Sequence, residues 1–319
     1  MHMSVFDTLF PAPRFLVMDH AGLEISDDSI RCVQFARTIH GMRIKKYASM
    51  DIPAGIIEGG DIKNEAEFKR ILTEFDEKND LSYVKVSIPE EKAYMFQTDV
   101  PSTDPHIATQ NIEFKLEENV PLSAADAVFY FDLIPAALTG GAIRASVSVV
   151  PRSYIERYIH ILRECDIFPI AFEVIPTAVA RSVASPDMST TELIVHGMKN
   201  KTGIYIISGG VVTFTSTVDY GSSTAPEAYS DLLAKEITRV NSYWLSRTGI
   251  HPNIQRVVLT GSGVSGYRAT LTTAITGIIP HIEVAQVWSH VLDLATYTPP
   301  IVQEESLNYA VAAGLGLDS

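Results

Sequence analysis

The sequence predicts an α/β protein with two related lobes and a small inserted α+β module. A strand–turn–strand unit at Gly22–Phe35 recurs at Leu193–Ile207, and in both units apolar residues flank a polar turn. Between the two units, residues 90–151 change to a pattern of strand, helix, strand and strand. A unit that opens each half of a 319-residue chain predicts a duplicated architecture with a cleft between the halves.

The first half continues with two strands and one amphipathic helix. Met42–Ile52 and Val84–Ile88 are predicted as strands, the second one buried. Between them, Asn64–Lys78 has helical periodicity, and Asn64 is the predicted N-cap. The apolar face of this helix consists of Phe68, Ile71, Leu72 and Phe75.

The inserted module precedes the return to the first lobe. Its predicted elements are strands at Tyr94–Val100, Val128–Leu133 and Ile143–Val150, a helix at Pro105–Asn119 and an Ala/Gly-rich loop at Pro135–Ala142. A helix at Ser153–Cys165 and the segment Ile170–Val183 then lead back to the first lobe and on toward the second. Within that segment, the Glu173 carboxylate either reaches into the cleft or, as we favour, pairs near a strand end.

The second lobe begins after the polar, Pro-containing stretch Ser185–Ser189. Val211–Val218 and Arg256–Thr260 are predicted strands, and Glu227–Arg247 is a long helix whose expected buried face is Leu232, Leu233, Ile237, Val240, Tyr243 and Trp244. The predicted domain ranges are 14–90 for the first part of the first lobe, 91–151 for the inserted subdomain, 152–188 for the return to the first lobe and 189–319 for the second lobe.

The bulk composition excludes several classes of function. A net charge of −13 without a block of Lys or Arg argues against nucleic-acid binding, which needs a basic face to neutralise phosphates. No window reaches the ~18 uninterrupted apolar residues of a membrane span, and no secretory signal is recognised. Cys32 and Cys165 lie in apolar patterns, so core thiols in a reducing compartment are expected. The sequence therefore predicts a cytoplasmic protein.

Candidate catalytic and metal-binding motifs are not found. The nine histidines show no His-x-x-x-His or Cys/His spacing, so no metal site is expected. No Walker-type or Gly-x-Ser-x-Gly motif is present either, and no catalytic residue is predicted. The apolar segment Ser4–Pro13 is expected to pack on its own domain, with contact to a membrane or a neighbouring subunit as the alternative.

Four stretches, taken in order, resemble the PilM family of type IV pilus assembly proteins, which is related to FtsA. They are GLEISDDSIR at 22–31, KNKTGIYIISGGVVTFTST at 199–217, EVAQVW at 283–288 and SLNYAVAAGLGL at 306–317. The resemblance implies a duplicated actin-like (ribonuclease H-like) fold of four subdomains with ATP in the cleft. It also implies a cytoplasmic adaptor that lies at the inner face of the cytoplasmic membrane by binding the short tail of a PilN-like membrane protein.

The resemblance implies a nucleotide site between the two strand–turn–strand units. Its expected residues are Glu24, Ser26, Arg31, His196, Lys199, Thr202, Gly261 and Gly263. Glu24 stands where the family has Asp, and Met198 stands where Gly lets the backbone approach phosphate. These departures predict a degenerate site with at most weak binding of ATP and Mg²⁺. The alternative is an active ATP-binding protein in which Glu24 holds the Mg²⁺ shell through water.

The loop Gly261–Gly266 supports a third possibility. It reads Gly-x-Gly-x-x-Gly after a predicted strand, and Glu283 follows at about the ~20-residue distance of a dinucleotide fingerprint. A dinucleotide-dependent enzyme is therefore a further alternative. Too little chain follows the loop for a full dinucleotide-binding domain, which favours a turn or an adenosine site instead.

The partner tail is expected in a groove between the first lobe and the inserted module. Acidic residues of the helix Pro105–Asn119 would meet a basic tail, and two aromatic residues would form an apolar floor. The expected residues are Glu113, Glu117, Glu118, Tyr130 and Phe172. Pilus ATPases and further copies of the chain are additional partners left open by the resemblance.

Overall fold

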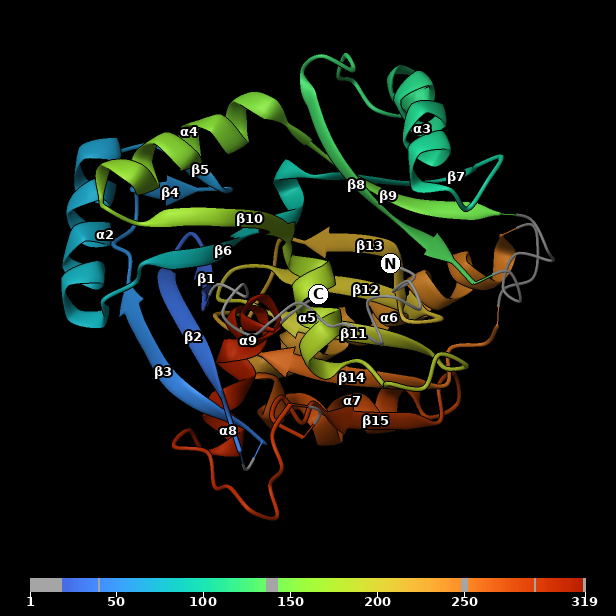
Figure 1. Cartoon of the computed structure of the whole chain (residues 1–319). Helices are drawn as coiled ribbons and strands as arrows, with labels where there is room; N and C mark the ends of the chain where they lie inside the picture. Colours follow the sequence, from blue (N-terminus) through green and yellow to red (C-terminus); the bar gives the residue numbers. More distant parts are fainter. Residues whose placement is uncertain (1–18, 40, 136–142, 248–251, 290, 318–319) are drawn as a thin grey trace.

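The computed structural model describes residues 19–317 apart from 40, 136–142, 248–251 and 290 (Figure 1). The segment Ser4–Pro13 and nearly all of the loop Pro135–Ala142 lie outside the described residues. The described chain contains two five-stranded sheets, a three-stranded sheet and a short two-stranded ribbon.

The first lobe is built on a mixed sheet. Its strand order is β3 (Gly41–Asp51), β2 (Ser29–Thr38), β1 (Ala21–Ile25), β6 (Tyr83–Ile88) and β10 (Phe168–Val174). The first three strands form an antiparallel meander, and β1, β6 and β10 run parallel. The predicted hairpin at Gly22–Phe35 is confirmed as β1 and β2, with Ile25 opposite Ile30.

The second lobe repeats this topology. Its sheet has the order β13 (Val211–Val218), β12 (Thr202–Ser208), β11 (Thr191–Gly197), β14 (Arg256–Gly261) and β15 (His281–Val284). Again the first three strands are an antiparallel meander, and the last three run parallel. The same strand order in both sheets confirms the predicted duplicated α/β architecture.

The inserted subdomain packs one helix on a small antiparallel sheet. The sheet order is β7 (Tyr94–Asp99), β9 (Arg144–Pro151) and β8 (Ala127–Ile134), and the helix is α3 (Pro105–Asn119). Ala108, Ile112 and Leu116 of α3 are buried against Val147 and Val149 of β9. Figure 1 shows α3 on the side of this sheet that faces away from the two main sheets.

The remaining helices cover the main sheets. Two of them, α2 (Glu65–Asn79) and α4 (Arg152–Glu164), pack on one face of the first sheet, and Asn64 caps α2 by accepting a hydrogen bond from the Glu67 N–H at 3.1 Å, as predicted. The other elements are β4 (Ile57–Glu58), β5 (Asp61–Ile62), η2 (Glu90–Lys92), α5 (Ile175–Val183), α6 (Pro226–Ser246), η4 (Val264–Tyr267), α7 (Arg268–Ile275), α8 (Gln303–Ser306), η5 (Leu307–Tyr309) and α9 (Ala310–Gly316).

A single hydrophobic core joins the two lobes through α5 and α9, which lie between the main sheets (Figure 1). It contains Val33 and Phe35 of β2 together with buried side chains of both helices and of the second sheet. In α6 the expected buried face is partly wrong, because Leu232 and Tyr243 are partly exposed. Leu233, Ile237, Val240 and Trp244 are buried as predicted.

Candidate functional site

The turns of the two hairpins meet at the junction of the lobes. They enclose a cavity together with the end of β14 and Asn308 of η5, and the cavity is lined by Glu24, Ser26, Asp28, Arg31, His196, Gly197, Met198, Lys199, Gly261, Ser262 and Asn308. Topology explains this meeting, since β1 and β11 occupy the same central position in the two sheets. The structure therefore brings Glu24, Ser26, Arg31, His196, Lys199 and Gly261 of the expected nucleotide site together.

This interlobe cavity is small. The volume open to the centre of a water molecule is about 10 Å³. This is about the minimum volume that holds one ordered water molecule. The phosphates of a nucleotide with their metal need several times that room. In this arrangement of the lobes, the two turns lie close together, and the cavity between them adjoins a larger open pocket at Gly261 and Asn308.

Glu24 is the buried acid of the cavity. Burial raises its pKa to about 7, although the Arg31 guanidinium at 3.5 Å opposes this shift. Its Oε2 atom is buried and has no hydrogen-bond partner among the described residues. A carboxylate in this environment is partly protonated near neutral pH, which makes it a poor organiser of a metal-bound water shell.

His196 lies on the opposite wall and is also buried. Burial and the nearby Arg31 and Lys201 charges lower its pKa to about 3, so the imidazole is neutral at physiological pH. Its Nδ1 atom has no hydrogen-bond partner in the described structure. His196 therefore supplies neither a negative nor a positive charge to the cavity.

A set of contacts that we term the interlobe bridge closes the site from the side. Lys201, at the exit of the second turn, forms an ion pair with Glu91 of η2, and its Nζ lies 4.0 Å from Oδ2 of Asp27 in the first turn. The Tyr205 hydroxyl donates to Oε1 of the buried Glu90 at 2.5 Å. Protein side chains thus connect the two lobes beside the interlobe cavity.

The interlobe bridge was missed by sequence analysis. Lys201 follows a polar turn, yet only 16% of its side chain is exposed. Its acidic partners follow Pro89 on a short 3₁₀ helix, and no spacing relates them to a turn about 110 residues further on. Only the fold brings these residues together.

Thr202 and Gly263 do not line the interlobe cavity. The Thr202 hydroxyl is buried, donates to the Tyr220 carbonyl at 2.7 Å and lies 2.8 Å from the Tyr229 hydroxyl. Its contacts support the packing of β12 on α6. Gly263 instead borders a neighbouring open pocket of about 350 Å³, lined by Gly261, Gly263, Val302, Glu304, Glu305, Leu307 and Asn308.

The glycine-rich loop has a structural requirement for two of its glycines. Gly261 and Gly263 have φ values of +85° and +71°, which side-chain-bearing residues rarely adopt. A Cβ on Gly261 would lie 2.1 Å from the Gly197 carbonyl oxygen, so this glycine lets the loop pack against the second hairpin. A Cβ on Gly266 would meet nothing within 4 Å.

The dinucleotide alternative is not supported by the position of the acidic residue. Glu283 pairs with Arg256, at the start of β14, with Nη1 and Oε1 2.5 Å apart, whereas the glycine loop follows the other end of that strand. The helix after the loop, α7, has eight residues and is preceded by a 3₁₀ turn. The position of Glu283 and the short α7 therefore both differ from a dinucleotide site, in which a pyrophosphate lies at the N-terminus of a helix.

The expected partner-binding residues are divided between two faces of the inserted subdomain. Glu113, Glu117 and Glu118 are exposed on α3. Tyr130 alternates with Phe129 and Phe131, which pack under α3, so its ring lies on the opposite face of the sheet. The structure does not bring the three glutamates and Tyr130 into one groove.

Tyr130 lies instead at the junction with the first lobe. Its ring is 61% exposed, and its hydroxyl donates to Asp132 at 3.0 Å. Partial burial and the Asp132 and Glu173 charges raise its pKa to about 12. Phe172 of β10 is partly buried against Val150 and Val174 at the same junction. Glu173 pairs with Arg181 at 2.7 Å, which confirms the preferred prediction of a paired carboxylate near a strand end.

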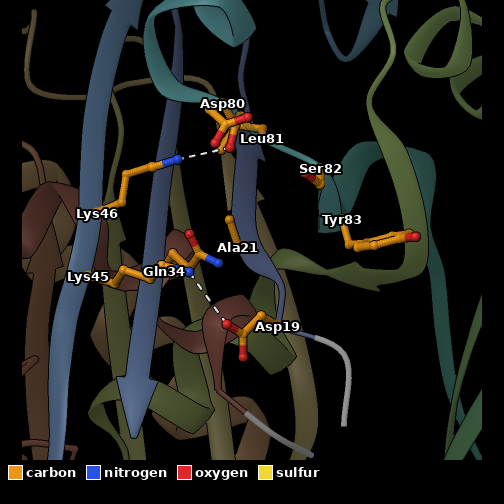
Figure 2. Close-up of a pocket in the computed structure, with 9 residues that line it drawn as sticks. All are labelled: Asp19, Ala21, Gln34, Lys45, Lys46, Asp80, Leu81, Ser82 and Tyr83. Atoms are coloured by element: carbon orange, nitrogen blue, oxygen red, sulfur yellow. Dashed lines mark hydrogen bonds and ion pairs between the residues drawn. The ribbon is translucent and has the colours of Figure 1, made fainter. Parts of the chain in front are cut away.

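A further cavity, of about 290 Å³, opens where β1 and β6 of the first sheet begin (Figure 2). Its lysines are already engaged: Lys45 Nζ lies 3.4 Å from Asp19, and Lys46 donates to the Asp80 carbonyl at 2.9 Å. No residue of the expected sites lines it. The mixed and internally paired charges of its walls do not define a ligand.

Within the described part of the chain, no three His, Cys, Asp or Glu side chains gather as metal ligands would. None of the described helices combines the length and the apolarity required to cross a bilayer.

Comparison with known proteins identifies the fold. No family model and no curated protein matches the sequence. Among solved structures, the chain is similar to that of a PilM–PilN type IV pilus biogenesis complex, with 17% identity, a TM-score of 0.76 and coverage of 95% of this chain and 98% of the other. The likeness agrees with the resemblance found in the sequence.

Two further structures are less similar. One is the cytoplasmic domain of EpsL, an inner-membrane component of the type II secretion system of Vibrio cholerae, at 14% identity, a TM-score of 0.50 and coverage of 92% and 94%. The other is a Bacteroides thetaiotaomicron protein of actin-like ATPase fold and unknown function, at 11% identity, a TM-score of 0.51 and coverage of 83% and 90%. The chain therefore has the duplicated, two-lobed actin-like fold that its sequence predicts.

Proposed function

We propose that this chain is a cytoplasmic adaptor of a type IV pilus or related secretion assembly. It binds the short cytoplasmic tail of a PilN-like membrane protein, and its nucleotide site is degenerate. Binding to that tail would hold the protein at the inner face of the cytoplasmic membrane. The similarity to a PilM–PilN complex over 95% of this chain supports the adaptor role.

The small interlobe cavity is the observation that best supports a degenerate nucleotide site. The small room that it leaves for a water molecule, the neutral His196 and the partly protonated Glu24 all argue against a bound magnesium–triphosphate group. The interlobe bridge supplies contacts between the lobes without a nucleotide. Function would then depend on docking surfaces.

The junction of the inserted subdomain with the first lobe is the best-supported place for the tail. There Tyr130 is exposed on β8, Phe172 near the end of β10 is partly buried, and Ile170 is exposed further back along β10. Both strands are edge strands, so an extended peptide can add main-chain hydrogen bonds to side-chain contacts. The Asp132 carboxylate beside Tyr130 favours a basic tail.

A peptide titration tests this proposal. A synthetic peptide with the sequence of a PilN-like N-terminal tail should bind saturably, and Tyr130→Ala should weaken binding by about tenfold or more because a buried aromatic contact is lost. Glu117→Lys should leave binding of this peptide unchanged, since Glu117 lies on the other face of the subdomain. Absence of saturable binding to the wild-type protein would contradict the adaptor role.

One observation favours a second candidate, an ATP-binding protein of the same fold. The buried Glu24 Oε2 and His196 Nδ1 atoms lack partners among the described residues, and the open pocket at Gly261 and Gly263 adjoins them. If the lobes opened, these groups would face an incoming ligand. A thermal-shift assay with Mg·ATP separates the two candidates, because a ligand at 100 times its Kd stabilises a protein by ~2.7 kcal/mol.

A further inference from the structure

The outer surface of α3 carries an exposed apolar stripe that the proposed tail site does not use. Ile107 and Phe114 are 46% and 82% exposed, and they lie seven residues apart, on the same face of the helix. The inner face is already occupied, since Ala108, Ile112 and Leu116 pack on the subdomain sheet. A phenylalanine this exposed has no packing role within the described chain.

The charges around this stripe are of one sign. Glu113, Glu117 and Glu118 are exposed beside Phe114, and no ion pair joins them to a basic side chain within the residues that the structure describes. The one lysine of the helix, Lys115, turns toward the sheet and donates to the Asp99 carbonyl at 2.7 Å. The rim of the stripe is therefore acidic and unneutralised by its own helix.

This charge arrangement is unfavourable for the isolated helix. Glu113 and Glu117 are like charges at i and i+4, which repel each other on a helix surface. Glu117 and Glu118 also lie in the last turn, where the negative end of the helix dipole disfavours carboxylates and where no basic residue offsets them. A positively charged partner would relieve both effects.

We propose that the outer face of α3 docks a basic amphipathic helix of a second protein, with Phe114 as the apolar anchor. Apolar residues of that helix would cover Ile107 and Phe114, and its Lys or Arg residues would face the three glutamates. A second copy of this face is an unsuitable occupant, since it would oppose glutamate to glutamate, and an anionic membrane would be repelled in the same way.

This inference rests on the proposed adaptor function and extends it. Tyr130 and α3 lie on opposite faces of the same small sheet, so the tail and the second partner can bind at the same time. The inserted subdomain, whose strands and helix form their own small hydrophobic cluster, would then join two proteins through one rigid unit.

The test uses a defined probe, a synthetic, fluorescein-labelled helical peptide with leucines along one stripe and lysines on both flanks. Binding to the full chain is measured by fluorescence anisotropy at low and at near-physiological salt. Phe114→Ala should weaken binding by about tenfold or more, whereas the control Ile39→Ala should not, although Ile39 is 93% exposed. A peptide of equal composition with scrambled leucines should bind about tenfold more weakly.

Charge variants complete the test. Glu117→Lys and Glu118→Lys should weaken binding and flatten its salt dependence, while Glu77→Lys on the exposed surface of α2 should do neither. Circular dichroism confirms folding, and the tail peptide is titrated in parallel. Equal effects of Phe114→Ala and Ile39→Ala would overturn the inference, as would a dimer in sedimentation that Phe114→Ala dissociates. Loss of tail binding alone would instead contradict the proposed function and leave the result for α3 intact.

Discussion

At the scale of single residues, the cleft is defined by two buried titratable side chains. Glu24 is only 3% exposed, with a pKa raised to about 7, and His196 is held neutral. Arg31 and Lys199 also line the cavity, and Arg31 forms an ion pair with Glu24. The charges of Glu24 and His196 are therefore set by their burial more than by their residue types.

The raised pKa of Glu24 predicts a specific pH dependence of stability. The folded state holds a proton on Glu24 up to about pH 7, whereas the unfolded state releases it near pH 4.5. The wild-type free energy of unfolding should therefore lose roughly 3 kcal/mol from this group as the pH rises from 4.5 through 7. Glu24→Gln should remove that loss, so that its stability relative to wild type increases between pH 5 and pH 8 in urea titrations.

Comparing the variant with the wild type at each pH cancels the contributions of other titrating groups, including His196. A difference that stays constant from pH 5 to pH 8 would show that Glu24 titrates normally. The same result would remove the argument that burial governs the charge of the site.

At the scale of elements, the central helix α9 depends on close backbone contacts. A Cβ on Gly314 would lie 1.8 Å from the Ala178 carbonyl oxygen of α5, and a Cβ on Gly22 would lie 2.0 Å from the Ala312 carbonyl oxygen. These glycines let α9 pack between β1 and α5, which places the neighbouring η5 and its Asn308 at the cleft.

Gly314→Ala should therefore lower the free energy of unfolding by about 2 kcal/mol or more, because the methyl group forces α5 and α9 apart. The matched control is Gly277→Ala, where a Cβ would meet nothing within 4 Å and φ is not positive. That variant should change stability by less than about 0.5 kcal/mol. Equal losses for the two variants in chemical denaturation would contradict the packing argument.

The elements themselves were largely predictable from sequence, for local reasons. The strand–turn–strand pattern located both hairpins, and Asn64 followed by an apolar stripe marked the start of α2. The positions of six expected cleft residues followed from the family resemblance. The side of the small sheet that α3 covers was not predictable. The alternation in Phe129–Phe131 places Tyr130 on the opposite face from its two neighbours, but it does not say which of the two faces packs against α3.

At the scale of the whole molecule, the contacts that matter most are non-local. Lys201 lies 110 residues from Glu91, and Tyr205 lies 115 residues from Glu90, so no sequence pattern announces their contacts. Together with the shared core around α5 and α9, they hold the lobes in a closed arrangement.

Removing the interlobe bridge should lower the stability of the protein and let the lobes move apart. Lys201→Ala leaves Glu91 and Asp27 without their cation and Tyr205→Phe leaves the buried Glu90 without its donor, so each should cost about 1–3 kcal/mol of stability. Small-angle scattering of the double variant should show a larger radius of gyration than that of the wild type. An unchanged radius with unchanged stability would show that the bridge does not hold the lobes together.

The central claim is that the chain's own side chains, and not a nucleotide, connect the second hairpin to η2 and to the first turn. The most direct measurement is a crystal structure of the protein grown with Mg·ATP in excess. The account predicts the Lys201–Glu91 and Tyr205–Glu90 contacts intact and no triphosphate between the turns. Density for an ordered triphosphate with its metal, with the lobes parted around it, would contradict the account.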